Sequence, residues 1–516
     1  MRLPGALLLL WLTAAGGLAQ DFRFNMVDQP ETLDPSRIGS WRQRFPYYAL
    51  FEGLIVNNPR TAKGEPGLAE SWKVSNGGRT YTFRLRKAVW SDGTPIVAQT
   101  VVDSWLRSLD PRTGSLLAEL MASNLEGGDA YFRGRGRKED VKVRALDART
   151  LEVTFILPGP HVLDLLTSWT WAVLPLHAIQ KFGDAWTKPG NFVGNGPFVL
   201  KEWKPGDRLV VVKNMNYWDA RHVKLGSITF FSVDDLAVGY DRYKAGQFDW
   251  QCDVDPARTD EVTGRKDFHR GAGSTVQYYI FSVTRKPFSD ARVRRAFSMA
   301  LDRGVLVAQV LKGDQLPTAG FVPSFGGFKT TRGNPFNPGL AGKLLAEAGY
   351  PGGRGFPKVE VIFNENANYK RIAEWAKQQW KAILGVDVEV RALDWDALLE
   401  ARQKTHDFLI ARAGWQADYP DPMNFLGDLL RTGSAANDGL YSNPKADALL
   451  ERACLLPGGP ARDRELMQAE ELMITQDQAV LPLYFHVNRD LIDLDKWGGW
   501  YENPLGIHPW KAIYRK

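Results

Sequence analysis

The chain has 516 residues, of which 44% are hydrophobic and 24% charged, the balance of a globular protein with several domains. A net charge of +6 is small for this length, and the one local basic cluster, residues 133–138, is interleaved with glycine, so the sequence does not favour a nucleic-acid-binding protein. The two cysteines, Cys252 and Cys454, are too few for a metal framework and leave room for at most one disulfide.

The N-terminus predicts a secretory signal peptide over residues 1–19. A charged start is followed by the apolar run 6–12, and the small residues Gly17 and Ala19 precede a cleavage site before Gln20. The apolar run is much shorter than the roughly 20 residues of a membrane-spanning helix. No cysteine lies near the cut, so we expect an exported protein without a lipid anchor.

The first predicted elements are strands. Residues 80–86 alternate between apolar and polar side chains, which is the period of a half-buried strand, and residues 76–78 before them have the composition of a turn. Two further strands, 141–145 and 151–157, are predicted to form a hairpin through residues 147–149.

The second half of the chain predicts a strand, a helix and a strand in succession. Residues 358–363 alternate, residues 373–384 carry apolar side chains at helical spacing, and residues 386–390 alternate again. This order implies a parallel pair of strands with a right-handed crossover. With two more helices predicted within 293–301 and 340–348, the fold class is α/β or α+β with mixed sheets.

Motifs of known enzymes are absent. The sequence has no G-x-S-x-G elbow, no H-E-x-x-H helix and no phosphate-binding or dinucleotide-binding glycine loop. The seven histidines are dispersed, and carboxylate pairs such as Asp234 with Asp235 are typical of solvated surface. We therefore predict no catalytic residues, no metal site and no cofactor.

One segment, residues 411–422, concentrates polar and aromatic side chains. It follows the apolar residues 408–410, interpreted as the end of a strand, and places Arg412, Trp415 and Asp418 close together among Gly and Pro. Such clusters, where a strand gives way to a loop, are typical of binding sites. An ordinary structured loop with a surface ion pair is the alternative.

The sequence resembles the oligopeptide-binding proteins of bacterial peptide ABC importers, the extracellular solute-binding proteins of family 5. The resemblance runs through nearly the whole mature chain and rests on motifs in the family's order. These are residues 32–35 (TLDP), 51–54 (FEGL), 67–72 (GLAESW), 81–95 with the signature VWSDGTP, 195–198 (NGPF), 217–218 (YW), 287–290 (PFSD) and 344–350 (LLAEAGY).

The resemblance implies a two-lobed periplasmic-binding-protein-like fold of type II, with an extra inserted domain, mixed sheets and a hinge between the lobes. Lobe I is then discontinuous, with the crossings near Ser274 and Val487. The implied division is a signal peptide 1–19, lobe I 20–51, 175–274 and 488–516, an inserted domain 52–174, and lobe II 275–487.

The resemblance also implies a ligand site. Asp418 matches the residue that binds the peptide α-amino group, a pairing that a buried ammonium needs. Arg402, Arg412 and Lys286 match cations that meet the peptide carboxylate. The aromatic residues Trp395 and Trp415 match the lining of side-chain pockets, and Gly414 and Gln416 belong to the same cleft.

Several cleft positions depart from the family pattern. Leu117 and His486 stand where relatives have tyrosines, and Gly39 replaces a glutamate near the N-terminus. Tyr369 replaces a histidine that reaches the carboxylate, and Cys252 falls near an asparagine position. Thr275 and Gln416 stand where the best-matched relatives have a disulfide. These departures leave the amino-group anchor intact and put the side-chain pockets and accepted peptide lengths in question.

The implied function is that of a periplasmic receptor, a monomer that binds short peptides through their backbone and termini and delivers them to the inner-membrane ABC permease and its ATPase subunits. Receptors for murein peptides, for dipeptides or for a non-peptide solute are alternatives within the family. An exported chaperone or sensor is a more remote one. Receptors for oligopeptides, murein peptides and dipeptides all need the Asp418 anchor, so the sequence does not separate these three.

Overall fold

The computed structural model describes residues 20–39, 42–116 and 118–516, so the predicted signal peptide lies outside the described residues. The chain enters the fold at β1 (Gln20–Asn25), a central strand of the largest sheet. In the described residues, no helix is long and apolar enough to cross a membrane.

This largest sheet has eleven strands and runs through the whole molecule, in the order β15-β14-β16-β12-β17-β11-β1-β10-β9-β8, with β13 on β17. It is mixed, because β1 pairs in parallel with β10 whereas β12 and β17 are antiparallel. Its other strands are β8 (Phe198–Lys204), β9 (Arg208–Lys213), β10 (Leu225–Phe231), β11 (Trp250–Cys252), β12 (Phe268–Phe281), β13 (Leu316–Pro317), β14 (Val359–Asn364), β15 (Val388–Leu393), β16 (Ile410–Gln416) and β17 (Val480–Ile492).

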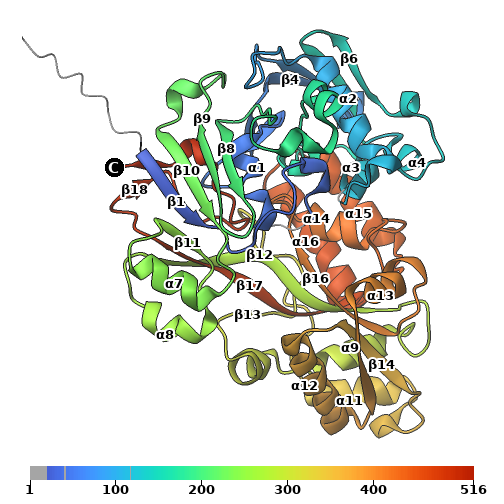
Figure 1. Ribbon diagram of the computed structural model, residues 1–516. Coiled ribbons are helices and arrows are strands. Elements are labelled where there is room, and N and C mark those ends of the chain that lie inside the picture. Colours follow the sequence, from blue (N-terminus) through green and yellow to red (C-terminus); the bar gives the residue numbers. More distant parts are fainter. Residues whose placement is uncertain (1–19, 40–41, 117) are drawn as a thin grey trace, which may run out of the picture.

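Two long strands, β12 and β17, join the two lobes, and they run through the middle of the molecule (Figure 1). At one end β17 pairs with β11 of lobe I, and at the other end β12 pairs with β16 of lobe II. The β12–β17 ladder is irregular between Ala272 and Val276, where the lobes meet. This irregularity lies at the predicted crossing Ser274, although the exact domain boundaries stay a prediction.

The alternation of β12 explains why it is a central strand. Val276, Tyr278 and Ile280 belong to one hydrophobic core, and Tyr279 and Phe281 belong to a second core on the opposite face of the sheet. Successive side chains of a strand point to opposite faces, so both faces of β12 are covered.

A separate four-stranded sheet lies within the predicted inserted domain, in the order β4-β5-β7-β6. The predicted hairpin and the strand at Thr80 are confirmed, with boundaries shifted by a few residues at the hairpin. The elements of this unit are β4 (Ala69–Ser75), β5 (Thr80–Leu85), β6 (Val143–Asp147), β7 (Thr150–Thr154), α2 (Ala98–Leu109), α3 (Ala118–Asn124), α4 (Gly128–Phe132) and α5 (His161–Leu165), beside the small pair β2 (Ile55–Asn57) and β3 (Gly64–Pro66).

Helices of lobe II confirm the strand–helix–strand prediction. α12 (Ala367–Leu384) connects β14 to β15, which pair in parallel, and Gly385 ends the helix with φ +72°, a conformation that glycine adopts without strain. The other helices of this lobe are α9 (Ala291–Met299), α10 (Arg303–Val305), α11 (Pro338–Glu347), α13 (Trp395–Leu399), α14 (Met423–Leu430), α15 (Pro444–Leu455) and α16 (Pro460–Glu470).

The remaining α-helices and strands fall in the residues predicted for lobe I. They are α1 (Tyr47–Leu50), α6 (Leu176–Phe182), α7 (Leu236–Lys244), α8 (Thr259–Val262) and the C-terminal pair β18 (Trp497–Gly498) and β19 (Tyr514–Arg515).

One prediction about the key segment is wrong. Residues 408–410 were expected to end a strand, but β16 begins at Ile410 and continues to Gln416. The reason is pairing with β12, whose Thr275 lies opposite Gln416 and whose Phe281 lies opposite Ile410. The Gly and aromatic residues that suggested a loop are held in a strand by this tertiary contact.

Candidate functional site

A cavity of about 280 Å³ lies between the lobes, beside the two crossing strands. Lobe I, the crossing strands and lobe II all contribute to its wall. Four of the predicted cleft residues line it, namely Cys252, Tyr369, Gln416 and His486. Ligand sites between lobes commonly take this form, with polar groups converging from several elements.

Arg412, on β16, approaches this cavity through its contacts. Its Nη2 atom donates to Gln277 Oε1 at 2.7 Å and to the Tyr369 hydroxyl at 2.6 Å, and its guanidinium lies 3.8 Å from the centre of the Tyr369 ring. Burial lowers the pKa of Arg412, and the nearby charge of Arg402 acts in the same direction. Within the described chain no carboxylate forms a salt bridge with Arg412, so this desolvated cation lacks a counterion.

His486 completes the group around Gln277. The Gln277 amide nitrogen and His486 Nε2 lie 3.2 Å apart. Because Gln277 Oε1 already accepts from Arg412, the amide nitrogen donates and His486 Nε2 accepts, which fits a neutral imidazole. The side chain of Gln277 itself is buried.

Gly414 makes this arrangement possible. A Cβ atom at position 414 would lie 2.6 Å from Gln277 Nε2 and 3.0 Å from Arg412 Nη2. Any side chain here would therefore push apart the two groups that meet beside the cavity.

The other predicted carboxylate-binding cations are placed differently. Arg402 donates twice to Asp438 Oδ2, at 2.9 and 2.6 Å, and both side chains are buried, so its charge is already matched. Lys286 is exposed and follows the end of β12 that is remote from the crossing. Of the three predicted cations, Arg412 is therefore the one that lies beside the cavity without a counterion among the described residues, and the roles of all three stay predictions.

Asp418 lies just beyond β16, partly buried. Asn424 orients it, because Asn424 Nδ2 donates to Asp418 Oδ2 at 3.2 Å while its Oδ1 accepts from the Asp418 backbone N–H at 2.9 Å. The indole of Trp415 donates to the same Oδ1 atom at 3.0 Å. Burial raises the pKa of Asp418 to about 7, and only the Asn424 hydrogen bond and the more distant charge of Arg44 oppose it. Asp418 forms no salt bridge with any described residue.

A buried ion-pair cluster lies three residues further on. Arg462 donates to both oxygens of Asp421 at 2.7 and 2.8 Å, with both side chains almost fully buried. Lys63, from the inserted unit, reaches the Pro420 carbonyl at 2.8 Å and Asp164 at 2.7 Å, and it lies 3.8 Å from Asp421. Burial alone would raise the pKa of Asp421, but the charge of Arg462 outweighs it and lowers the pKa to about 2. This cluster joins the inserted unit to lobe II.

The remaining predicted residues lie at the margins. Trp395 begins α13 with 51% of its surface exposed, and Gly39 is exposed beside Leu116. Leu117 lies outside the described residues. Cys252 and Cys454 are both buried and are not bonded to each other, so they do not form the one disulfide that the sequence allowed.

Sequence reasoning missed Gln277 and Asn424. The alternation of β12 could have placed Gln277 on the face opposite Val276, but not its contact with Arg412. No pattern marks Asn424 as the partner of Asp418, because the contact depends on how α14 packs beneath the loop.

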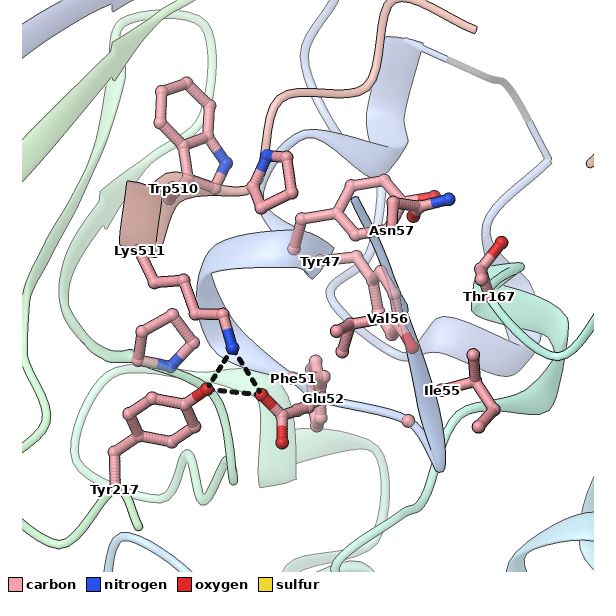
Figure 2. A pocket seen from close by; sticks show the side chains of 14 residues that line it. Tyr47, Phe51, Glu52, Ile55, Val56, Asn57, Thr167, Tyr217, Trp510 and Lys511 are labelled. Atoms are coloured by element: carbon pink, nitrogen blue, oxygen red, sulfur yellow. Dashed lines mark hydrogen bonds and ion pairs between the residues drawn. The ribbon is translucent and has the colours of Figure 1, made fainter. Parts of the chain in front are cut away.

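A second, much smaller cavity of about 40 Å³ lies in lobe I, around Glu52. Figure 2 shows Lys511 and Tyr217 pointing toward this carboxylate, and the Trp218 indole donates to it at 2.6 Å. Burial raises the pKa of Glu52, opposed by Lys511 and these hydrogen bonds. This space holds only a few waters, and the Glu52 carboxylate in its wall already has its hydrogen-bond partners. We interpret these contacts as a link between the C-terminal segment and the rest of lobe I, and not as a ligand site. The described residues contain no cluster of His, Cys, Asp or Glu suited to a metal ion.

Two lobes connected by two strands, with a polar cavity between them, define a two-lobed binding protein. Comparison with known proteins gives the family. The model described as bacterial extracellular solute-binding proteins, family 5 Middle, matches residues 63–437. This chain therefore belongs to the family 5 bacterial extracellular solute-binding proteins.

Relatives in the family carry different ligand names. The periplasmic oligopeptide-binding protein OppA of Escherichia coli K12 is 33% identical over 496 residues, covering 93% of this chain and 90% of that protein. The probable deoxycholate-binding periplasmic protein YgiS of the same organism is also 33% identical, over 478 residues, covering 90% and 88%. A solved structure of a periplasmic oligopeptide-binding protein (OppAIV) from Borrelia burgdorferi has a TM-score of 0.78 and 33% identity, covering 96% of this chain and 100% of that one.

Proposed function

We propose that this protein is the substrate-binding component of an ABC importer, and that it captures short peptides between its lobes outside the cytoplasmic membrane. In this proposal the predicted signal peptide exports the chain to the periplasm. The monomer then delivers its ligand to the permease and ATPase subunits, and it carries out no reaction on the peptide.

One observation carries the proposal: β16 and the loop after it hold a carboxylate and a guanidinium that both lack a counterion. Asp418 is the desolvated anion, and Arg412 is the desolvated cation. A buried charge is stable only when it is paired, and a peptide carries an ammonium at one end and a carboxylate at the other. A bound peptide would therefore supply both missing partners.

The spacing of these two groups supports a short ligand. A strand advances about 3.3 Å per residue, so the Cα atoms of Arg412 and Gln416 are about 13 Å apart, with Asp418 beyond them. An extended peptide of about four residues covers the part of the span from Arg412 to Gln416. Because the anchors are the two termini, side chains would contribute less to recognition than length.

Native mass spectrometry of the purified mature protein tests the proposal, followed by denaturation and sequencing of the released ligand. We expect a mixture of peptides of roughly two to six residues, intact and varied in sequence, in line with the terminus spacing. A single non-peptide compound would instead indicate a receptor for a non-peptide solute, as in the relative named for deoxycholate. Release of long chains would favour an exported chaperone, and release of cleaved products would favour an enzyme.

A further inference from the structure

Besides Asp418, a second carboxylate lacks a counterion, that of Asp490 on β17. Asp490 is 9% exposed and lines the interlobe cavity. Its Oδ1 atom accepts a hydrogen bond from the Trp250 indole at 2.8 Å. In the part of the chain that the structure describes, Oδ2 accepts no hydrogen bond and no cationic side chain lies within 4.0 Å of it.

The charged groups around Asp490 do not neutralise it. Asp253 and Glu502, the charges that act on it most strongly, are both acids. Arg489, the next residue on β17, instead lies 3.4 Å from Asp253 and 3.6 Å from Asp314. Arg489 lines the same cavity, but these two acids match its charge, and it forms no salt bridge with Asp490.

The two histidines of this region do not supply the missing charge either. His508 packs against Trp250, with ring centres 4.9 Å apart, and burial lowers its pKa to about 3, so it stays neutral. His269, opposite Asp490 in the β12–β17 ladder, bonds the Ile492 carbonyl at 3.0 Å and lies 3.7 Å from Glu502.

We propose that this end of the cavity is a subsite for a cationic side chain of the ligand, with Asp490 as the residue that selects it. The aromatic side chains of Phe45 and Trp250 also line the cavity and would cover the aliphatic stem of a lysine or arginine, while its charged end pairs with Oδ2. The inference rests on the proposed function and adds a side-chain preference to a site otherwise recognised through the peptide termini.

The test compares lysine with norleucine, which keeps most of the aliphatic stem and lacks the ammonium group. Alanine tripeptides, tetrapeptides and pentapeptides carry one or the other residue at each position after the first, and calorimetry at pH 7.5 gives each affinity. We expect lysine to bind about 10- to 100-fold more tightly than norleucine at one position, the range of a charge-assisted hydrogen bond. A ratio near one at every position would overturn the subsite.

The variant Asp490→Asn assigns the effect, with Asp253→Asn as a matched control. Asparagine keeps the acceptor for Trp250, and thermal unfolding checks that the variant is folded. We expect Asp490→Asn to bring the lysine-to-norleucine ratio to within about threefold of one. Asp253→Asn removes a charge from the same cavity, and we expect it to keep most of the preference. Equal loss in both variants, or no loss in Asp490→Asn, would overturn the role of Asp490.

The norleucine peptides distinguish failure of the cationic subsite from failure of the proposed peptide-binding function. If norleucine peptides bind and lysine adds nothing, only the cationic subsite fails. If no peptide of either series binds, the proposed peptide function fails and the subsite fails with it.

Discussion

Asp418 and Asp421 lie three residues apart in one loop, and the pKa values of their carboxylates are shifted in opposite directions. Burial acts on both. Asp421 is matched by Arg462, and its pKa falls to about 2, whereas Asp418 has only an amide partner, and its pKa rises to about 7. The opposite directions of the two pKa shifts therefore follow from the partner.

Within this one loop, the paired Asp421 serves the stability of the fold, and the unpaired Asp418 serves ligand binding. A paired buried charge holds the surrounding elements together, here lobe II and the inserted unit. An unpaired buried carboxylate destabilises the fold by itself, and that free energy can be recovered when a ligand supplies the counterion. We therefore expect changes at Asp421 to act on stability and changes at Asp418 to act on binding.

The largest expected effect is on folding. Asp421→Ala would leave Arg462 buried without a partner, which costs about 3–5 kcal/mol of unfolding free energy. Chemical denaturation of the mature protein measures it, and Asp421→Ala combined with Arg462→Ala should cost less than the sum of the two single changes. A loss below about 1 kcal/mol would show that the ion pair does not hold the lobes together.

The next effect is on affinity. Asp418→Ala removes the partner of the peptide ammonium and should weaken binding about 10- to 1,000-fold by calorimetry, because one charge-assisted bond is lost and the ammonium stays unpaired. Peptides acetylated at the N-terminus are the control, since they lack the charge and should bind wild type and variant alike. Unchanged affinity for free peptides would refute the assignment of Asp418.

A third effect is a pH dependence with a definite sign. The ammonium binds the ionised form of Asp418, whose pKa is about 7 without ligand, so affinity falls as the pH drops below 7. For peptides with uncharged side chains we expect about 50-fold weaker binding at pH 5 than at pH 7.5. The Asp418→Ala variant should show a flat profile over this range, and a flat profile in wild type would contradict the raised pKa.

A smaller effect concerns the opposite end of the ligand. Amidation of the peptide C-terminus should weaken binding to wild type about tenfold, the value of one charge-assisted bond to Arg412. In Arg412→Met the free acid and the amide should bind equally, whereas Arg402→Met should keep the wild-type ratio because Arg402 already pairs with Asp438. If Arg402→Met removed the preference instead, the two arginines would have to exchange roles.

The smallest effect is a stability change at Asp418 itself. Its raised pKa means that the folded state holds a proton more tightly than the unfolded chain, so this group's contribution to stability declines as the pH rises from about 4 to about 7. Asp418→Asn should therefore have an unfolding free energy about 1–3 kcal/mol higher than wild type at pH 8, seen as a higher unfolding temperature, with no difference at pH 4. A variant less stable than wild type at pH 8 would contradict it.

The sequence predicted most of the local structure and the chemistry of single residues. The parallel β14–β15 pair and the cap at Gly385 follow from periodicity and from glycine, and both are confirmed. Where the prediction was wrong, as for β16, tertiary pairing overrode local composition. Alternation and turn residues describe a segment by itself, whereas this strand depends on pairing with a strand about 130–140 positions earlier in the chain.

The sequence could not predict which charged side chains of the site lack a counterion. Arg402 and Arg412 look equivalent in sequence, and only the folded chain shows that Asp438 neutralises one of them. The same holds for Asp418 and Asp421, whose difference depends on Arg462, a helix residue about forty positions away. Counterions are a property of packing, and the resemblance to a family supplied residue roles without their partners.

Gly414 sets a limit for anyone who wants to redesign this protein as a sensor or a carrier. Even an added methyl group would meet Gln277 and Arg412 at 2.6 and 3.0 Å, so the position offers no route to a new ligand preference. Trp395, half exposed at the start of α13, is a position where substitutions are expected to cost less. A library of variants would therefore gain most from leaving β16 untouched and varying the rim around it.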